Sequence, residues 1–145
     1  MKDSNLDNIY NLKNKVVVIT GSCGQLGSSM CNLFVNIGCK VIGIDYSIES
    51  NKINNVDYYQ LDIRKSKDVS TVFKSIFNKF NKIDVLINNA GVSVFEPFED
   101  RTEQNFDWVM NVNLKGTFNC IQKYVDCYDS QSQNKGCIIN IASMY

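Results

Sequence analysis

The stretch Val16–Gly27, VVVITGSCGQLG, decides how the chain folds. Its first half is a short apolar run rich in β-branched residues, which is typical of a buried parallel strand. The run leads into three glycines spaced G-x-x-G-x-x-G, and a helical pattern follows. A strand, a glycine turn and a helix N-terminus together form a pyrophosphate site, because glycine allows close backbone approach and the helix N–H groups face the anion. We therefore predict a dinucleotide-binding βαβ unit.

Length and charge limit the class of protein. The 145 residues suit one domain with a buried core, and the 15 basic residues balance the 15 acidic ones. This balance, without a basic cluster, argues against a nucleic acid partner. No apolar stretch reaches the ~18 residues of a membrane span, and Met1–Asn14 is too polar for a signal peptide. We expect no membrane association, an N-terminal arm over residues 1–14 and one domain over residues 15–145.

The sequence contains no histidine, which excludes Ser-His-Asp and Cys-His catalysis and histidine-based metal sites. A proton must then move through tyrosine, lysine, a carboxylate or water. The six cysteines are scattered without a C-x-x-C pair, a pattern typical of reduced thiols rather than of disulfides or a zinc site. We predict no metal site and a cytoplasmic protein.

Short apolar runs alternate with helical patterns along the chain, which predicts an α/β fold with a parallel sheet. We expect a Rossmann-type, doubly wound sheet of about five strands in the order 3-2-1-4-5, with helices on both faces and the ligand at the switch point between the first and fourth strands. Strands are predicted near residues 16–20, 40–45, 58–61, 83–88 and 137–141, and helices near residues 26–37, 66–80 and 102–128. The last helix would begin at a Thr102 cap, and its buried side would carry Phe106, Val109, Leu114, Phe118, Ile121 and Val125.

Asp45 ends the second predicted strand and is the residue expected to select the cofactor. A carboxylate at this point accepts hydrogen bonds from the 2′- and 3′-hydroxyls of an adenosine ribose and repels a 2′-phosphate, which favours NAD over NADP. Tyr46 and Ser47 come next, so no arginine or lysine follows directly to receive a phosphate. The alternative is an ordinary aspartate at a strand end, and the glycines upstream favour the functional interpretation.

Over most of its length the chain resembles the short-chain dehydrogenase/reductase family, because several motifs stand in the family's order. Thr20-Gly21 opens the glycine turn, Leu61-Asp62-Ile63 matches the adenine-side contact, and Asn88–Gly91 (NNAG) matches the signature of the fourth strand. Asn113 matches the asparagine of the long helix, and Ser143 matches the serine after the fifth strand.

This resemblance implies hydride transfer between nicotinamide and a carbonyl or secondary alcohol of a small molecule. It implies catalytic positions at Ser143 and Asn113. The residues that it implies to contact the cofactor are Gly21, Ser22, Cys23, Gly24, Gln25, Leu26, Gly27, Asp45, Tyr46, Asp62, Ile63, Asn89, Ala90 and Gly91.

The glycine spacing departs from the family's common short form, which would need a glycine where this chain has Gln25. The spacing found here is associated with the extended branch, whereas Asn88–Gly91 belongs to the short form. Because the mixture also occurs in some short-form members, we assign the short form and leave the geometry of the turn open.

The family's Tyr-x-x-x-Lys pair, in which lysine and the oxidised nicotinamide lower the tyrosine pKa from ~10, lies on the helix after the serine. The sequence ends two residues after Ser143, and no such pair follows it. We therefore expect an incomplete C-terminal side, NAD binding and negligible turnover. Tyr145 would share a strand face with Ser143, but no lysine is placed to lower its pKa, and we assign it to a turn.

Two alternatives stay open beside an incomplete dehydrogenase. One is a binding module that holds NAD and pairs with a full-length relative or with its own copy. The other is a fragment that does not fold stably, because the strand at residues 137–141 would leave an apolar edge uncovered. The residues around Ile141–Tyr145 also resemble members encoded with glycan-modifying genes, which points to a sugar or glycan precursor as substrate.

Overall fold

Five parallel strands form one sheet in the order β3-β2-β1-β4-β5. The computed structural model describes residues 11–48, 52–127 and 136–143. This order confirms the predicted doubly wound arrangement. The first three strands extend the sheet to one side of β1, and β4 and β5 extend it to the other side, so the switch point lies between β1 and β4. The strands are β1 (Val16–Thr20), β2 (Lys40–Asp45), β3 (Val56–Gln60), β4 (Val85–Asn88) and β5 (Cys137–Asn140).

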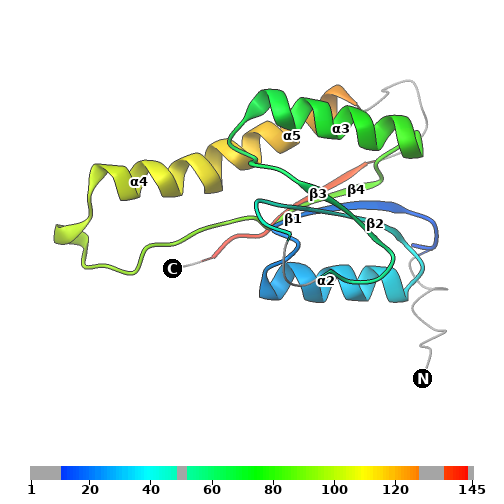
Figure 1. Cartoon of the computed structure of the whole chain (residues 1–145), viewed down its shortest axis with the longest axis horizontal. Coiled ribbons are helices and arrows are strands. Elements are labelled where there is room, and N and C mark those ends of the chain that lie inside the picture. The colour runs from blue at the N-terminus through cyan, green and yellow to red at the C-terminus, as the bar shows by residue number, and fades with distance from the viewer. Residues whose placement is uncertain (1–10, 49–51, 128–135, 144–145) are drawn as a thin grey trace.

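Helices cover both faces of the sheet, as predicted (Figure 1). On one face lies α2 (Gln25–Asn36), and on the other lie α3 (Ser66–Phe80) and α5 (Thr117–Asp126). A further helix, α4 (Glu103–Met110), extends past the end of the sheet in line with α5. Among the described residues, no helix combines the length and the apolar character that crossing a membrane requires.

Strand β1 is the centre of the core because its residues are buried on both faces. Val16 and Val18 belong to the apolar cluster under α3 and α5, whereas Val17 and Ile19 belong to the cluster under α2. This alternation is the two-residue period of a strand, applied to a sheet that is covered on both sides. The continuous apolar run in the sequence therefore predicts the central strand correctly.

Strand β5 forms an edge of the sheet, and all four of its residues are exposed. It pairs with β4 in parallel register, with Leu86 opposite Ile138 and Ile87 opposite Ile139. Ile138 and Ile139 retain 36% and 41% of their accessible surface. The predicted uncovered apolar edge is therefore present.

The long helix predicted over residues 102–128 is interrupted, because Asn111–Gly116 forms a π-helix, η2, between α4 and α5. Thr102 caps the N-terminus as predicted, its hydroxyl accepting a hydrogen bond from Asn105 N at 3.2 Å. The predicted apolar side is wrong in most positions. The exposed residues are Phe106, Leu114, Phe118 and Val125, while Gly116, Asn119, Cys120 and Tyr124 are buried. The buried positions Gly116, Cys120 and Tyr124 recur every four residues and form the side that packs on the sheet. The apolar residues Leu114, Phe118 and Val125 also keep a helical spacing, but on another side of the segment, and Phe106 lies on α4, beyond the end of the sheet.

Smaller differences concern the ends of elements. Lys65 is the N-cap of α3, and within the described residues no side chain caps this helix. The third strand was predicted near residues 58–61. It lies at Val56–Gln60, so it begins two residues earlier and ends one residue earlier. Of the arm over residues 1–14, only residues 11–14 are described, and the Leu12 carbonyl accepts a hydrogen bond from Cys39 Sγ at 3.2 Å. Tyr145, assigned to a turn, lies outside the described residues.

Asp84 joins the start of β1 to the loop before β4 from a nearly buried position. Its carboxylate accepts a hydrogen bond from Val16 N at 2.7 Å and pairs with Lys15 and Lys82 at 3.2 and 2.9 Å. Burial alone would raise the pKa of Asp84, but the Val16 N–H and the two ammonium groups outweigh burial and lower the pKa below its usual value.

Replacing Asp84 by asparagine should reduce the free energy of unfolding at pH 7 by about 1–3 kcal/mol, because two lysines lose a buried partner. Since the folded-state pKa is depressed, this stabilisation is present above the unfolded-state pKa of ~3.9 and disappears as the pH falls through the folded-state value. Urea unfolding should show a smaller difference in the free energy of unfolding between wild type and Asp84→Asn at pH 3 than at pH 7. Asp57→Asn, which breaks an exposed pair with Lys79, is the control. An equal difference in the free energy of unfolding at both pH values would contradict the role assigned to the ionised Asp84 carboxylate.

Candidate functional site

The turn after β1 is compact because three glycines allow parts of the backbone to touch. Gly21 has φ +65°, and the Gly24 N–H donates to the Gly21 carbonyl at 3.2 Å. A Cβ atom at Gly27 would lie 2.0 Å from Gly21 O, so only glycine fits there. Helix α2 then begins at Gln25, and within the described residues no side chain caps it. The N–H groups of its first turn are thus available to an anion.

The ends of four strands surround one cleft of about 600 Å³. Because all strands are parallel, their carboxyl ends meet at one edge of the sheet, beside the switch point. Most of the predicted cofactor contacts line this cleft: Gly21, Gly24, Gln25, Leu26, Gly27, Asp45, Tyr46, Asp62, Ile63, Asn89, Ala90 and Gly91. The lining also includes Leu61, from the motif matched to the adenine-side contact. Its other members, Ile44, Arg64, Val92, Trp108 and Val112, were not among the predicted contacts.

Ser22 and Cys23 lie in the turn but not in the lining of the cleft. Ser22 is fully buried, and its N–H donates to the Ile44 carbonyl at 3.2 Å. A Cβ atom at Gly43 would lie 2.8 Å from Ser22 Oγ, so the absence of a side chain on β2 makes room for the turn. These contacts fix the turn against β2.

The Asp45 carboxylate lies at the end of β2, in the wall of the cleft. It accepts hydrogen bonds from Cys23 N at 2.9 Å and from Ser47 N at 3.2 Å. A carboxylate offers about four lone-pair sites, so two remain for hydroxyl donors of a ligand. Burial raises the pKa of the Cys23 thiol, and the neighbouring Asp45 charge raises it further.

Asn89 links the end of β4 to the end of β1. Its side-chain amide donates to the carbonyls of Thr20 and Gly21, both at 3.1 Å. The buried Thr20 hydroxyl in turn accepts from the N–H groups of Asn89 and Ala90, at 3.1 and 3.0 Å. Side-chain donors of Asn89 are therefore occupied by the glycine turn, and the residue holds together the two strands that flank the switch point.

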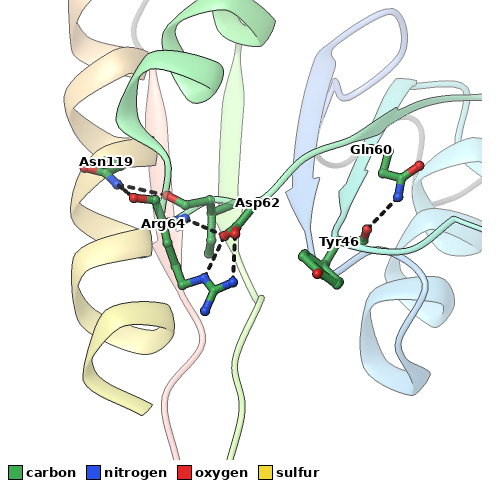
Figure 2. A network of polar contacts seen from close by, with 6 residues as sticks. Tyr46, Gln60, Asp62, Arg64 and Asn119 are labelled. Carbon is green, nitrogen blue, oxygen red and sulfur yellow. Dashed lines mark hydrogen bonds and ion pairs between the residues drawn. The ribbon is translucent and has the colours of Figure 1, made fainter. Parts of the chain in front are cut away.

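The segment after β3 forms the far wall of the cleft and carries an ion pair, Asp62–Arg64 (Figure 2). The guanidinium Nε and a terminal nitrogen of Arg64 donate to the two carboxylate oxygens of Asp62, at 2.9 and 2.8 Å. The Arg64 side chain thereby holds the pKa of the Asp62 carboxyl below its usual value. Buried Asn119 supports this wall from α5 by donating to the Ile63 and Arg64 carbonyls at 2.9 and 3.3 Å.

The two residues implied to be catalytic are not lining residues of the cleft. Asn113 lies in η2 and holds the segment that follows Gly91, since its side chain accepts from Val92 N at 2.8 Å and donates to Val92 O at 2.9 Å. Ser143 follows β5 at the same edge of the sheet and is exposed. Among the described residues, no group of three or more Cys, Asp or Glu side chains is placed to hold a metal ion.

Sequence motifs alone did not identify Arg64 and Asn119. A search for a basic residue directly after Asp45 misses Arg64, which reaches the cleft from the loop after β3. Asn119 stands in a helical pattern as one polar residue among several, and only the fold shows that it is buried against the wall.

The family model of the short chain dehydrogenase matches residues 15–145. The chain therefore belongs to the short-chain dehydrogenase family, whose members bind nicotinamide cofactors.

Among curated relatives, a 3-oxoacyl-[acyl-carrier-protein] reductase of Thermotoga maritima is 34% identical, over 92% of this chain and 57% of its own length. A 2-dehydro-3-deoxy-D-gluconate 5-dehydrogenase of Escherichia coli is 33% identical, over 93% of this chain and 56% of its own. This chain thus spans little more than half the length of these relatives.

Solved structures match this chain over a similar share of their own length. A short chain dehydrogenase of Leptospira borgpetersenii with bound NAD⁺ matches with a TM-score of 0.81 and 36% identity, over 92% of this chain and 56% of that chain. Another, described as ElxO with NADP bound, matches with a TM-score of 0.81 and 28% identity, over 90% of this chain and 56% of that chain. Neighbours with either cofactor therefore share this fold.

Gly27→Ala should destabilise the protein by about 1–3 kcal/mol or more, because the new methyl group would overlap the Gly21 carbonyl. Gly24→Ala is the matched control, since its Cβ would lie 3.4 Å from the same oxygen, an ordinary contact, and its φ is −70°. The control should change stability by no more than about 0.5 kcal/mol. Urea unfolding of both variants checks this, and equal midpoints would contradict the described packing.

Asp45→Asn should make the Cys23 thiol react faster with iodoacetamide at pH 8, because removing the neighbouring charge lowers the thiol pKa and increases the thiolate fraction. Peptide mass spectrometry over a time course measures the rate at each cysteine. Cys127 is an internal control, since burial and Asp126, not Asp45, raise its pKa. An unchanged rate at Cys23 would show that the two groups are not coupled.

Proposed function

We propose that this chain binds NAD and forms the cofactor-binding part of an enzyme that transfers hydride between nicotinamide and a carbonyl or secondary alcohol. The position of Asp45 carries the proposal, because its carboxylate lines the cleft beside the glycine turn. The family supports the reaction class, and similar proteins are named as a reductase of 3-oxoacyl groups and a dehydrogenase of a sugar acid.

The residues of the cleft fit a dinucleotide. The pyrophosphate would lie at the start of α2, where Gly21, Gly24 and Gln25 line the cleft and a side chain at Gly21 would collide with Ala90 at 2.8 Å. The free N–H groups and the helix dipole supply the positive potential for this anion. A cleft of about 600 Å³ lies within the usual size range of ligand pockets.

Asp45 favours NAD over NADP. Its two remaining acceptor sites suit the two hydroxyls of a ribose, whereas a 2′-phosphate would bring like charges together. Arg64, a basic residue in the lining, is paired with Asp62 and so presents little net positive charge for a phosphate.

The cofactor, when bound, supplies the hydride donor or acceptor of the reaction. We propose that the Ser143 hydroxyl donates a hydrogen bond to the substrate oxygen at the carboxyl edge of β5. Asn113 acts as a positioning residue, since its two hydrogen bonds hold Val92 and with it the wall that follows Gly91. The sugar or glycan substrate and the cytoplasmic location stay predictions from the sequence.

A binding module that pairs with another chain is the second candidate. Phe106, Leu114, Phe118 and Val125 on the α4–η2–α5 segment each expose more than half of their surface. Apolar side chains gathered along one segment are typical of surfaces that contact a protein. Light scattering after gel filtration separates a monomer from a homo-oligomer, and co-expression with a full-length relative tests the mixed pair.

Calorimetry with NAD and NADP tests the proposed function. We expect micromolar binding of NAD, with NADP at least about 10-fold weaker. Asp45→Asn should weaken NAD by about 10- to 100-fold, because hydrogen bonds to a charged acceptor are worth ~1.5–3 kcal/mol, and it should reduce the preference over NADP. Asp57→Asn, on β3 outside the lining, is the control. A cooperatively folded wild type that binds neither dinucleotide would refute the proposal.

A further inference from the structure

The wall formed by Leu61–Arg64 is fixed by the fold itself. Asn119 is only 4% exposed, and its amide nitrogen holds two successive carbonyls of the wall, at 2.9 and 3.3 Å. A Cβ atom at Gly116 would lie 2.6 Å from Ile63 Cδ1, so the missing side chain in η2 admits Ile63 at close range. Contacts within the fold therefore hold the backbone that carries Arg64.

The guanidinium of Arg64 is held flat by two parallel hydrogen bonds to Asp62. The Arg64 N–H adds a third bond to the same carboxylate, at 3.0 Å. Of about four acceptor sites on Asp62, three are thus occupied by one residue. A ligand at this end of the cleft meets the planar guanidinium beside a carboxylate with about one acceptor site left, although the family resemblance would have Asp62 contact the adenine.

Tyr46 supplies an aromatic ring to the same cleft, and Figure 2 shows it across the gap from the Arg64 guanidinium. Its backbone is anchored, because Gln60 Nε2 donates to the Tyr46 carbonyl at 3.0 Å. Tyr46 is 68% exposed, so it is accessible to a ligand. A planar guanidinium stacks on aromatic faces and keeps this ability when a carboxylate binds its edge.

We propose that Arg64 is the residue that positions the adenine base, by stacking its guanidinium on the ring while Tyr46 bounds the other side of the base. This inference rests on the proposed NAD site and deepens it. Recognition by stacking depends on the flat ring and not on its exocyclic amino group. Arg64 already occupies three of the about four acceptor sites of the Asp62 carboxylate, the group that would otherwise accept from the amino group.

The test compares the dissociation constants of three ligands: NAD, its deamino analogue with hypoxanthine in place of adenine, and NADP. In wild type, the deamino analogue should bind within about 3-fold of NAD, because both bases stack. Arg64→Ala should weaken both by about 5- to 30-fold. Arg64→Lys keeps the charge but loses the planar guanidinium, so it should weaken both ligands to a similar extent. This variant replaces Arg64→Ala in the test if the alanine variant does not fold. Arg101→Ala is the matched control, since Arg101 pairs with Glu96 and does not line the cleft.

Each other outcome has a defined meaning. A deamino analogue more than 10-fold weaker than NAD in wild type would show that the amino group is read, which overturns the inference. So would a larger loss for NADP than for NAD in Arg64→Ala, because it would indicate a phosphate contact. Unchanged NAD affinity in either Arg64 variant would also overturn it. If folded wild type binds no dinucleotide, the proposed function itself fails.

Discussion

The hydrogen bonds between the end of β1 and the residues that follow β4 determine the arrangement of the cleft. Thr20 and Gly21 offer two carbonyls and a hydroxyl at the switch point, and Asn89 and Ala90 satisfy all three. Buried backbone groups without partners are costly, so this pairing fixes how β4 meets the glycine turn. Since a Cβ atom at Gly27 would lie 2.0 Å from the Gly21 carbonyl, α2 also packs on the same point. Two strands and a helix are thereby fixed at one position.

The cleft follows from this arrangement. Parallel strands present their carboxyl ends at one edge, so Asp45, Asp62 and Gly91 come together although they are far apart in sequence. The two walls are fastened in different ways. Hydrogen bonds from Asn89 hold the β1–β4 side, and Asn119, a single residue on α5, holds the β3 side. Both asparagines use side-chain amides to satisfy loop carbonyls, which keeps the backbone of the cleft rigid.

Local patterns predicted the elements whose burial follows their own sequence. The apolar run of β1, the bounds of β2 at Lys40–Asp45 and the Thr102 cap are local properties, and the structure agrees with them. The face of the long helix was predicted wrongly because its apolar stripe lies away from the sheet, while the side that packs on the sheet carries Gly116, Asn119 and Cys120, which do not stand out in a hydrophobic pattern. The role of Arg64 was missed for another reason. Its partner is close in sequence, but its place in the cleft depends on β3 packing beside β2.

The partnership of Thr20 with Asn89 also has a consequence for the order of folding. The two residues are separated by 69 positions, so a growing chain that has made β1, α2 and β2 still lacks the partner that completes the turn. Loop closure over this distance carries an entropy cost before any contact repays it. The contacts of Asn89 with the glycine turn therefore form only after β4 has been synthesised and has docked beside β1, although the residues of the turn are among the first made.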